Sequence, residues 1–313
     1  MKKIIIFLLL LVGLVSHAQI LPPGVKLPDN ISDADCFVIP KGFQWDIAKK
    51  YQSAVLPASN RVQSYANLLV GDVDGDGKPE IITLNFLTNS YFSNGIQIFN
   101  HDLTLKKTIP VQASETYVTL PLAIGDVNND GKPEIIYGTG YRNVTGGLYY
   151  RLLAYHADGT LVWTSSDSYI SSYTSTYFHS SSISIADLDG DGKVEILAGD
   201  RIFAGESGKL LATLPAGGRG LQKNASTTIV SGYLPAIGDI DGDGIQEIAC
   251  RNTTYRVTIN SRINPALNSV AIVGKINMVD GYTSLADSDG DGLVDVVVVG
   301  RPTNGDDSQM YVW

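Results

Sequence analysis

A nine-residue acidic motif occurs five times in this chain of 313 residues, and it restricts the possible folds more than any other feature. The copies begin at Asp72, Asp126, Asp187, Asp239 and Asp287, so consecutive copies start 54, 61, 52 and 48 residues apart. Sequence repeats with a period near 50 residues are typical of stacked supersecondary units, each of which buries its apolar face only against a neighbour. The motif therefore predicts a repeat architecture.

Short apolar strands surround each copy. The expected first strands, directly before the motif, are 66–71, 120–125, 182–186, 234–238 and 283–286, and the second strands, directly after it, are 80–86, 134–140, 195–199, 247–251 and 295–300. Third strands are expected at 95–100, 149–156, 202–206, 255–260 and 309–313, and fourth strands at 105–111, 161–165, 209–215 and 270–276. These segments are rich in β-branched and aromatic residues and are separated by turn-forming residues. Four strands in about 50 residues predict an all-β fold of β-propeller blades, because a β-sandwich needs about 100 residues.

Small residues end every first strand: Gly71, Gly125, Ala186, Gly238 and Ala286. We expect them where the inner strands of a propeller crowd together. The fifth repeat stops after its third strand, which would leave an open edge. Either residues 37–66 supply the missing strand, or the ring is incomplete here and the natural chain continues past Trp313. The second alternative is favoured, because five blades lie at the low end of the usual range.

The motif itself has the composition of a metal-binding loop. Oxygen-bearing side chains occupy positions 1, 3, 5 and 9, and position 6 is always glycine, whose positive φ lets the loop fold around an ion and turns the position-7 carbonyl inward. An all-oxygen, flexible shell suits Ca²⁺ better than Mg²⁺ or Zn²⁺. The predicted ligands, up to five structural Ca²⁺ in all, are Asp72, Asp74, Asp76, Lys78 and Glu80; Asp126, Asn128, Asp130, Lys132 and Glu134; Asp187, Asp189, Asp191, Lys193 and Glu195; Asp239, Asp241, Asp243, Ile245 and Glu247; and Asp287, Asp289, Asp291, Leu293 and Asp295, with the fourth residue of each set acting through its carbonyl.

The distribution of charge agrees with this interpretation. Of the 32 acidic residues, 19 fall in the five loops, where they would repel one another without a cation. The alternative is a set of solvated Asp-Gly turns, but turn chemistry does not require four acids in each. An EF-hand is excluded, because the flanks are strands and the twelfth position never carries Glu. The net charge of −9 argues against nucleic acid as a partner.

The first 18 residues have the pattern of a secretory signal peptide. Lys2 and Lys3 precede an apolar run, Ile4 to Val15, which is followed by Ser16-His17-Ala18. The run is shorter than the ~20 residues of a transmembrane helix, although an uncleaved anchor remains the alternative. We expect a mature, exported protein with no membrane span, a partly extended segment over residues 19–63 and the propeller over residues 64–313. Cys36 and Cys250 could pair outside the cell, but an inert buried thiol is favoured for Cys250.

Long aromatic loops are expected at the ends of the sheets opposite the acidic loops. The candidate ligand-binding residues there are Tyr91, Tyr141, Arg142, Tyr173 and Tyr177, and Phe92 and Tyr169 lie in the same loops. Such loops on a rigid scaffold commonly carry recognition, and tyrosine suits protein or glycan ligands. The alternative is that these tyrosines only pack loop against loop.

The motif D-x-[DN]-x-D-G-x-x-[DE], placed between apolar strands, resembles the FG-GAP/VCBS repeats of integrin-α-like β-propellers over roughly residues 64–313. The resemblance implies a propeller, commonly seven-bladed, with Ca²⁺ in the loops that join the first and second strands. It also implies a secreted or cell-surface protein, often a binding module and sometimes attached to an enzyme. This sequence shows five repeats and has no clear FG-GAP tripeptide.

The sequence therefore predicts an exported calcium-binding recognition or adhesion module for an extracellular protein or glycan, without catalysis of its own. Two alternatives stay open. One is a polysaccharide-active, lyase-like enzyme that would use Arg142, Arg219, Lys223 and His179, and the other is a passive spacer in a larger surface protein. His101 and His156 fall in turns between outer strands and show no pattern of a nucleophile partner.

Overall fold

The computed structural model describes residues 51–53, 56, 61–62, 66–86, 93–111, 122–139, 141–142, 148–169, 182–215, 234–250, 252–276, 280–301 and 309–313. These residues form an all-β structure in which one turn of 3₁₀ helix, η2 (Pro265–Leu267), is the single helical element described. None of the described helical segments has the length and hydrophobicity needed to cross a membrane. All described residues belong to a unit that comprises Lys50–Trp313.

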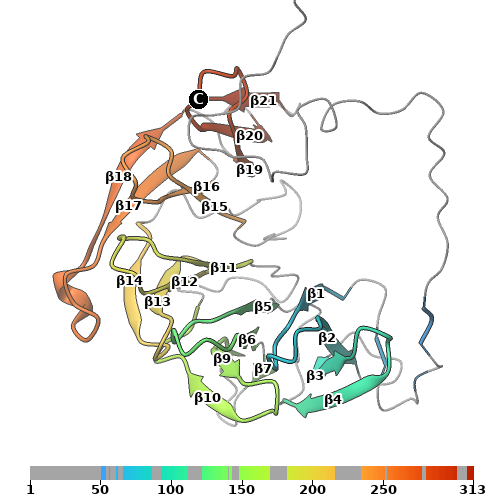
Figure 1. Cartoon of the computed structure of the whole chain (residues 1–313). Coiled ribbons are helices and arrows are strands. Elements are labelled where there is room, and N and C mark those ends of the chain that lie inside the picture. Colours follow the sequence, from blue (N-terminus) through green and yellow to red (C-terminus); the bar gives the residue numbers. More distant parts are fainter. Residues whose placement is uncertain are drawn as a thin grey trace, which may run out of the picture. The chain divides into compact units, whose positions relative to one another are not determined.

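Five antiparallel sheets follow one another along the chain (Figure 1). Sheet 1 contains β1 (Leu68–Gly71), β2 (Glu80–Phe86), β3 (Ser93–Phe99) and β4 (Leu105–Pro110). Sheet 2 contains β5 (Leu122–Gly125), β6 (Glu134–Gly138), β9 (Leu152–Tyr155) and β10 (Leu161–Thr164), and sheet 3 contains β11 (Ile183–Ala186), β12 (Glu195–Ala198), β13 (Arg201–Ala204) and β14 (Leu210–Thr213). Sheet 4 contains β15 (Ala236–Gly238), β16 (Glu247–Cys250), β17 (Thr253–Thr258) and β18 (Ser269–Lys275), and sheet 5 contains β19 (Asp280–Ala286), β20 (Asp295–Arg301) and β21 (Gln309–Val312).

The predicted repeat unit is confirmed as an up-and-down sheet. In sheets 1 to 4 the four predicted strands pair in chain order, and sheet 5 has the three strands that the sequence predicts. One element was not expected: a two-stranded hairpin of β7 (Tyr141–Arg142) and β8 (Leu148–Tyr149) interrupts the second repeat between β6 and β9. Closure of the sheets into a propeller ring, and the number of blades, stay predictions.

The acidic motif has the same register in all five sheets. The small residue that ends each first strand pairs with the position-9 acid that begins the second strand, as in Gly71 with Glu80 and Ala286 with Asp295. The same pairing holds in the other three sheets. Each acidic loop therefore connects the two strands of one antiparallel hairpin. Its position-9 acid always lies opposite the last residue of the first strand.

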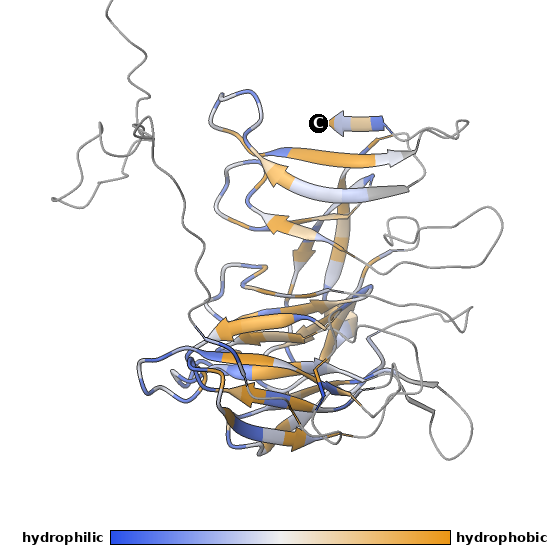
Figure 2. Ribbon diagram, turned by 90° about the vertical axis from the view of Figure 1, so that its right-hand side faces the viewer, coloured by the Kyte–Doolittle hydropathy of each residue, from blue (hydrophilic) through white to orange (hydrophobic). Residues whose placement is uncertain are grey.

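The burial of the strands explains their sequences. The second strands of sheets 1 to 4 are largely buried, and in β2 every residue except Ile81 is buried. The first strand β1 and the outer strand β4 are largely exposed, which agrees with the lysines of β4. Figure 2 shows that the strands are coloured mainly hydrophobic and the turns that join them mainly hydrophilic. A continuous apolar run is expected where a strand is covered on both faces.

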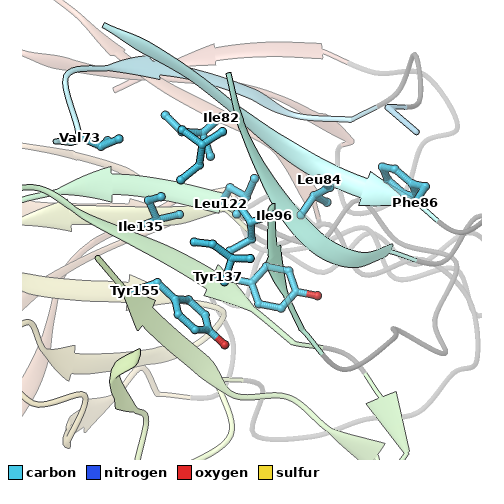
Figure 3. Packing of buried hydrophobic residues seen from close by; sticks show 11 residues of the cluster. Val73, Ile82, Leu84, Phe86, Ile96, Leu122, Ile135, Tyr137 and Tyr155 are labelled. Atoms are coloured by element: carbon cyan, nitrogen blue, oxygen red, sulfur yellow. The ribbon is translucent and has the colours of Figure 1, made fainter. Parts of the chain in front are cut away.

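The hydrophobic core consists of four clusters, each shared by two consecutive sheets. The first cluster packs Ile82, Leu84 and Ile96 of sheet 1 against Ile135 and Tyr137 of sheet 2 (Figure 3). Equivalent clusters join sheets 2 and 3, sheets 3 and 4, and sheets 4 and 5. Among the described residues no cluster joins sheet 5 to sheet 1. Because each sheet buries its faces against its neighbours in sequence, the period of about 50 residues is the period of the packing.

The small residues at the ends of the first strands are needed for this packing. A Cβ atom added to Gly71 would lie 2.5 Å from the Ile124 side chain of the next sheet, and one added to Gly238 would lie 2.8 Å from Leu285. Gly125 approaches Ile185 of sheet 3 in the same way, at 3.0 Å. The expectation of close approach between inner strands is therefore confirmed at these three positions.

Most of the predicted N-terminal segments lie outside the described residues. This holds for the signal peptide over residues 1–18, for nearly all of residues 19–63, and for Cys36. Within the described part, Arg61 forms an isolated bridge with Phe86 at the end of β2. Cys250 is buried in β16, as expected for a core thiol, and its pairing with Cys36 stays untested.

Candidate metal centres in the acidic loops

The position-1 aspartate organises each loop by accepting backbone hydrogen bonds. In the third loop Asp187 Oδ1 accepts from the N–H groups of Gly190 and Asp191 at 2.8 and 3.1 Å, and Oδ2 accepts from Gly192 at 2.9 Å. The bond from the position-6 glycine to Oδ2 recurs in all five loops, at 2.8 to 3.0 Å. The position-1 carboxylate therefore holds the turn closed through the chain's own amides.

Two residues with positive φ, at positions 4 and 6, make this turn possible. The position-6 glycines have φ between 82° and 90°, as the sequence predicts. Position 4 also has a positive φ in every loop: it is glycine in four loops and Asn129, at 59°, in the second. This second left-handed residue was not predicted, although the Gly or Asn at position 4 was the available signal. Only Gly, Asn and Asp adopt such angles readily.

The position-9 carboxylate closes the other side of each loop. One of its oxygens accepts the N–H of the position-2 residue, as in Glu80 Oε2 with Val73 at 3.1 Å and Glu195 Oε2 with Leu188 at 2.9 Å. The same bond forms in the other three loops. The four position-9 glutamates are buried, and the second carboxylate oxygen of each stays available to other partners.

In four loops three of the predicted acids lie close together: those at positions 1, 3 and 9 in loops 1 and 3, and those at positions 1, 3 and 5 in loops 4 and 5. Ligand atoms within each of these sets lie within 4.8 Å of one another: Asp72, Asp74 and Glu80; Asp187, Asp189 and Glu195; Asp239, Asp241 and Asp243; and Asp287, Asp289 and Asp291. In the second loop Asn128 replaces the position-3 acid, and its Nδ2 donates to Asp130 Oδ2 and Glu134 Oε1 at 3.1 and 3.2 Å. The amide thus acts as a donor toward the same carboxylates.

The position-5 and position-7 residues interact in every loop. The position-5 Oδ1 accepts the N–H of the position-7 residue at 2.8 to 2.9 Å in all five loops. Ligation by the carbonyls of Lys78, Lys132, Lys193, Ile245 and Leu293 stays a prediction. At Asp239, Oδ1 is buried and has no hydrogen-bond partner. A buried carboxylate oxygen without a partner is costly, and a cation would satisfy it.

Burial and mutual repulsion raise the pKa of several acids in these loops. Burial raises the pKa of Glu195 to about 7, although Arg262 donates to this carboxylate. The pKa of Glu134 is raised for the same reason, and that of Asp189 is raised by burial and by the charge of Asp191. Ionisation of these groups at neutral pH therefore costs free energy, and a bound cation would remove this cost.

Basic side chains contact the acids of four loops, and none of these contacts was predicted from the sequence. Lys106 donates to Asp74 and to Glu80 Oε1, the latter at 2.9 Å, and its hydrogen bond lowers the pKa of Asp74. Arg256 contacts Asp241, Asp243 and Glu247 of the fourth loop. In the third loop Arg262 contacts Glu195, and in the second loop His156 Nδ1 lies 3.3 Å from Glu134 Oε1. His156, in a turn between outer strands as expected, thus lies against a position-9 glutamate.

The candidate ligand-binding tyrosines lie mostly outside the described residues. This applies to Tyr91, Tyr173 and Tyr177, as well as Phe92 and His179. Tyr141 and Arg142 form the short strand β7. Tyr169, which was grouped with the recognition loops, is instead a core residue: it is 1% exposed, its ring packs edge-on against Tyr150, and its hydroxyl donates to the Thr139 carbonyl. For Tyr169 the alternative interpretation, packing of loop against loop, is correct.

Part of the chain is similar to a known repeat. Residues 72–137, which contain the first two acidic loops, match the family model of the FG-GAP-like repeat. No curated protein matches the chain significantly. The crystal structure of the V. cholerae biofilm matrix protein Bap1 is 22% identical, with a TM-score of 0.49 over 84% of this chain and 39% of that chain. The crystal structure of the exotype rhamnogalacturonan lyase YesX is 18% identical, with a TM-score of 0.42 over 79% and 55%. The chain spans about two fifths and just over half of the lengths of these two proteins.

Proposed function

We propose that this protein is an exported, non-catalytic recognition or adhesion module whose sheets are stabilised by Ca²⁺ bound in the acidic loops. The observation that carries the proposal is the repeated convergence of carboxylates at one place in the fold, the hairpin between the first and second strands of each sheet. The match of residues 72–137 to the FG-GAP-like repeat supports the same reading of the first two loops.

The donor set fits calcium better than other common ions. All side-chain donors are oxygen atoms of Asp, Glu and Asn, and no His or Cys belongs to the motif. The loops are short, largely exposed and held by flexible carboxylates, which suits the six to eight ligands and variable geometry of Ca²⁺ better than the strict octahedron of Mg²⁺. The unpartnered Oδ1 of Asp239 is a specific place where a cation would satisfy a buried acceptor.

The proposed residues have distinct tasks in holding the ion. The carboxylates at positions 3 and 5 would bind it, and the position-1 aspartate would bind it while keeping its backbone hydrogen bonds. The position-9 carboxylate oxygen that does not accept the position-2 N–H would bind from the start of the second strand. A bound Ca²⁺ supplies two positive charges that offset the repulsion among these acids. Because the ligands come from both ends of the loop, binding links the first strand to the second.

The experiment is a thermal melt of the mature chain in calcium and in EDTA. Binding to the folded state alone raises stability by about 2.7 kcal/mol per site at a hundredfold excess over Kd. We expect a lower melting temperature in EDTA that excess CaCl₂ restores and MgCl₂ restores poorly. Identical melts in calcium and EDTA would contradict the proposal, as would calorimetry that detects no binding of calcium.

The recognition role is assigned to the ends of the sheets opposite the acidic loops. In up-and-down sheets the connection from second to third strand lies at the other end from the connection between first and second strands. In repeats 1 and 2 the sequence between β2 and β3 contains Tyr91, and that between β6 and β9 contains Tyr141. A glycan and matrix-protein array tests this: alanine at Tyr141 or Tyr173 should reduce binding without changing the melting temperature. Cleavage of acidic polysaccharides with new unsaturated ends would instead favour an enzyme.

A further inference from the structure

Three of the acidic loops are contacted by a permanently charged side chain that comes from outside the loop. The Nζ atom of Lys106, on β4, is bonded to the position-3 and position-9 carboxylates of loop 1. The guanidinium of Arg256, on β17, is bonded to the position-3, position-5 and position-9 carboxylates of loop 4. These are the oxygens that the proposed function assigns to calcium.

Arg262 makes the third contact from a different repeat. It belongs to the connection between β17 and β18 of sheet 4, yet it reaches Glu195 and lies 3.8 Å from Asp191 in loop 3. The carbonyl of Val194, at position 8 of the loop, also accepts from it, and both oxygens of Glu206 accept from it outside the loop. Its side chain is 13% exposed, about half the exposure of Lys106 or Arg256.

The register of the sheets explains why the three cations come from different places. Arg256 is the direct cross-strand partner of Glu247, so its side chain leaves β17 beside the position-9 acid. In sheet 3 the corresponding partner of Glu195 is Ala204, which is too small to reach the carboxylate. Arg262, which belongs to the following repeat, contacts Glu195 instead. In sheet 5, among the described residues, no Lys, Arg or His forms a salt bridge with Asp287, Asp289, Asp291 or Asp295.

Resting on the calcium role proposed above, we propose that Lys106 and Arg256 are tethered counter-ions that occupy the carboxylates of loops 1 and 4 and must be displaced before these loops bind Ca²⁺. The loops are therefore unequal: loop 5, which no cation among the described residues contacts, binds calcium at the lowest concentration, and loops 1 and 4 bind it last. Arg262 keeps its bonds to Glu206 when calcium takes Glu195, so it acts as a fixed brace between two repeats.

Competition follows from charge and position. A single positive charge at the carboxylates lowers the local negative potential that attracts a divalent ion, and the same oxygens cannot serve both cations fully. The side chains of Lys106 and Arg256 are 29% and 28% exposed, so each can swing into water on its flexible stem when calcium arrives. Without calcium the same contacts stabilise the loop. The cation thus favours the metal-free fold and opposes metal binding.

The test uses Lys106→Met, which keeps the aliphatic stem and removes the charge, with Lys107→Met as the matched control on the same strand. Lys107 is exposed and, among the described residues, forms no salt bridge with loop 1; because each variant removes one lysine, the two have the same net charge. Calcium binding to the full mature chain is followed by calorimetry, and melting temperatures are measured in EDTA and in CaCl₂. Arg256→Met provides a second, independent variant in loop 4.

We expect Lys106→Met to melt lower than Lys107→Met in EDTA but at an equal or higher temperature in calcium. We also expect it to raise the calcium affinity of one site at least about fivefold, because calcium no longer has to break a contact between Lys106 and a carboxylate, worth about 1 kcal/mol for two unit charges about 4 Å apart in bulk water. Equal losses of melting temperature in both conditions, with unchanged affinity, would overturn the counter-ion role while leaving the calcium role intact. Absence of any calcium effect in the unmodified chain would overturn both.

Discussion

The two aspartates Asp187 and Asp189 of loop 3 should behave differently when each is replaced by alanine. Asp187, at position 1, accepts three backbone hydrogen bonds within the loop, whereas Asp189, at position 3, accepts one, from Asp191 at 3.2 Å. The pKa of Asp189 is raised by burial and by the neighbouring negative charge, so its ionised form costs stability without an ion. The Asp187 carboxylate therefore stabilises the loop itself, whereas the Asp189 carboxylate contributes mainly when a cation is bound.

The magnitudes follow from these contacts. With about 0.7 kcal/mol for each lost hydrogen bond, within the usual net range, Asp187→Ala should cost about 2 kcal/mol in EDTA. For a chain of this size that lowers the melting temperature by about 4–8 °C. Asp189→Ala loses one bond but removes an unfavourable charge, so we expect a change within about 0.5 kcal/mol in EDTA.

Calcium changes how each variant compares with the unmodified chain. At a hundredfold excess over Kd, one site contributes about 2.7 kcal/mol, or about 5–11 °C, and both variants should lose this contribution. Asp189→Ala should therefore match the unmodified chain in EDTA and fall below it in calcium, while Asp187→Ala should fall below it in both. Paired melts by calorimetry measure this directly. If Asp189→Ala were as destabilising as Asp187→Ala in EDTA, this division of tasks would be wrong.

Three further predictions concern the junctions and charges of the loops. Gly205→Ala would place a Cβ 2.5 and 2.7 Å from the carbonyl oxygens of Val127 and Val194, so it should cost about 1–3 kcal/mol in urea unfolding, equally with and without calcium. Asn128→Asp replaces an amide donor by a fourth acid, so it should lower the melting temperature in EDTA and raise the calcium affinity of loop 2 in calorimetry. The pKa of Glu195 is about 7 in the fold against 4.5 ordinarily, so without calcium its contribution to stability is present at low pH and is lost as the pH rises from about 4.5 to 7. Protons then compete with calcium, so affinity measured at pH 6.0 should be lower than at pH 7.5, with the difference reduced in Glu195→Gln.

Local sequence patterns were sufficient to predict the strands. Each repeat has an apolar strand on either side of the acidic loop, and the turn residues between strands mark their ends, so hairpins such as β1–β2 follow from neighbouring residues alone. The hairpin of β7 and β8 was missed because residues 139–147 are polar and rich in glycine, and this composition predicts a loop. Ring closure depends on contacts between distant repeats, which no local pattern encodes.

In the candidate sites, too, contacts between residues close in sequence could be predicted and contacts between distant residues could not. The acids of each loop are close in sequence, and their convergence at Asp72, Asp74 and Glu80 follows from a nine-residue pattern. Arg262 and Glu195 are 67 residues apart and meet only because two sheets pack together, so spacing could not reveal the contact. Tyr169 looked like a surface aromatic for a related reason: the backbone carbonyl that accepts its hydroxyl lies 30 residues earlier in the chain.

Sharing each hydrophobic cluster between two sheets has a consequence for how such a chain can change length. Sheets 2, 3 and 4 each contribute to two clusters, whereas among the described residues sheet 5 contributes to one, whose buried members are Ala249, Val296 and Val298. Loss of an interior repeat would leave two exposed surfaces to be rejoined, while duplication of a repeat adds one loop and one core of the same kind. Gain or loss of a repeat should therefore be tolerated most easily where a sheet contributes to a single cluster.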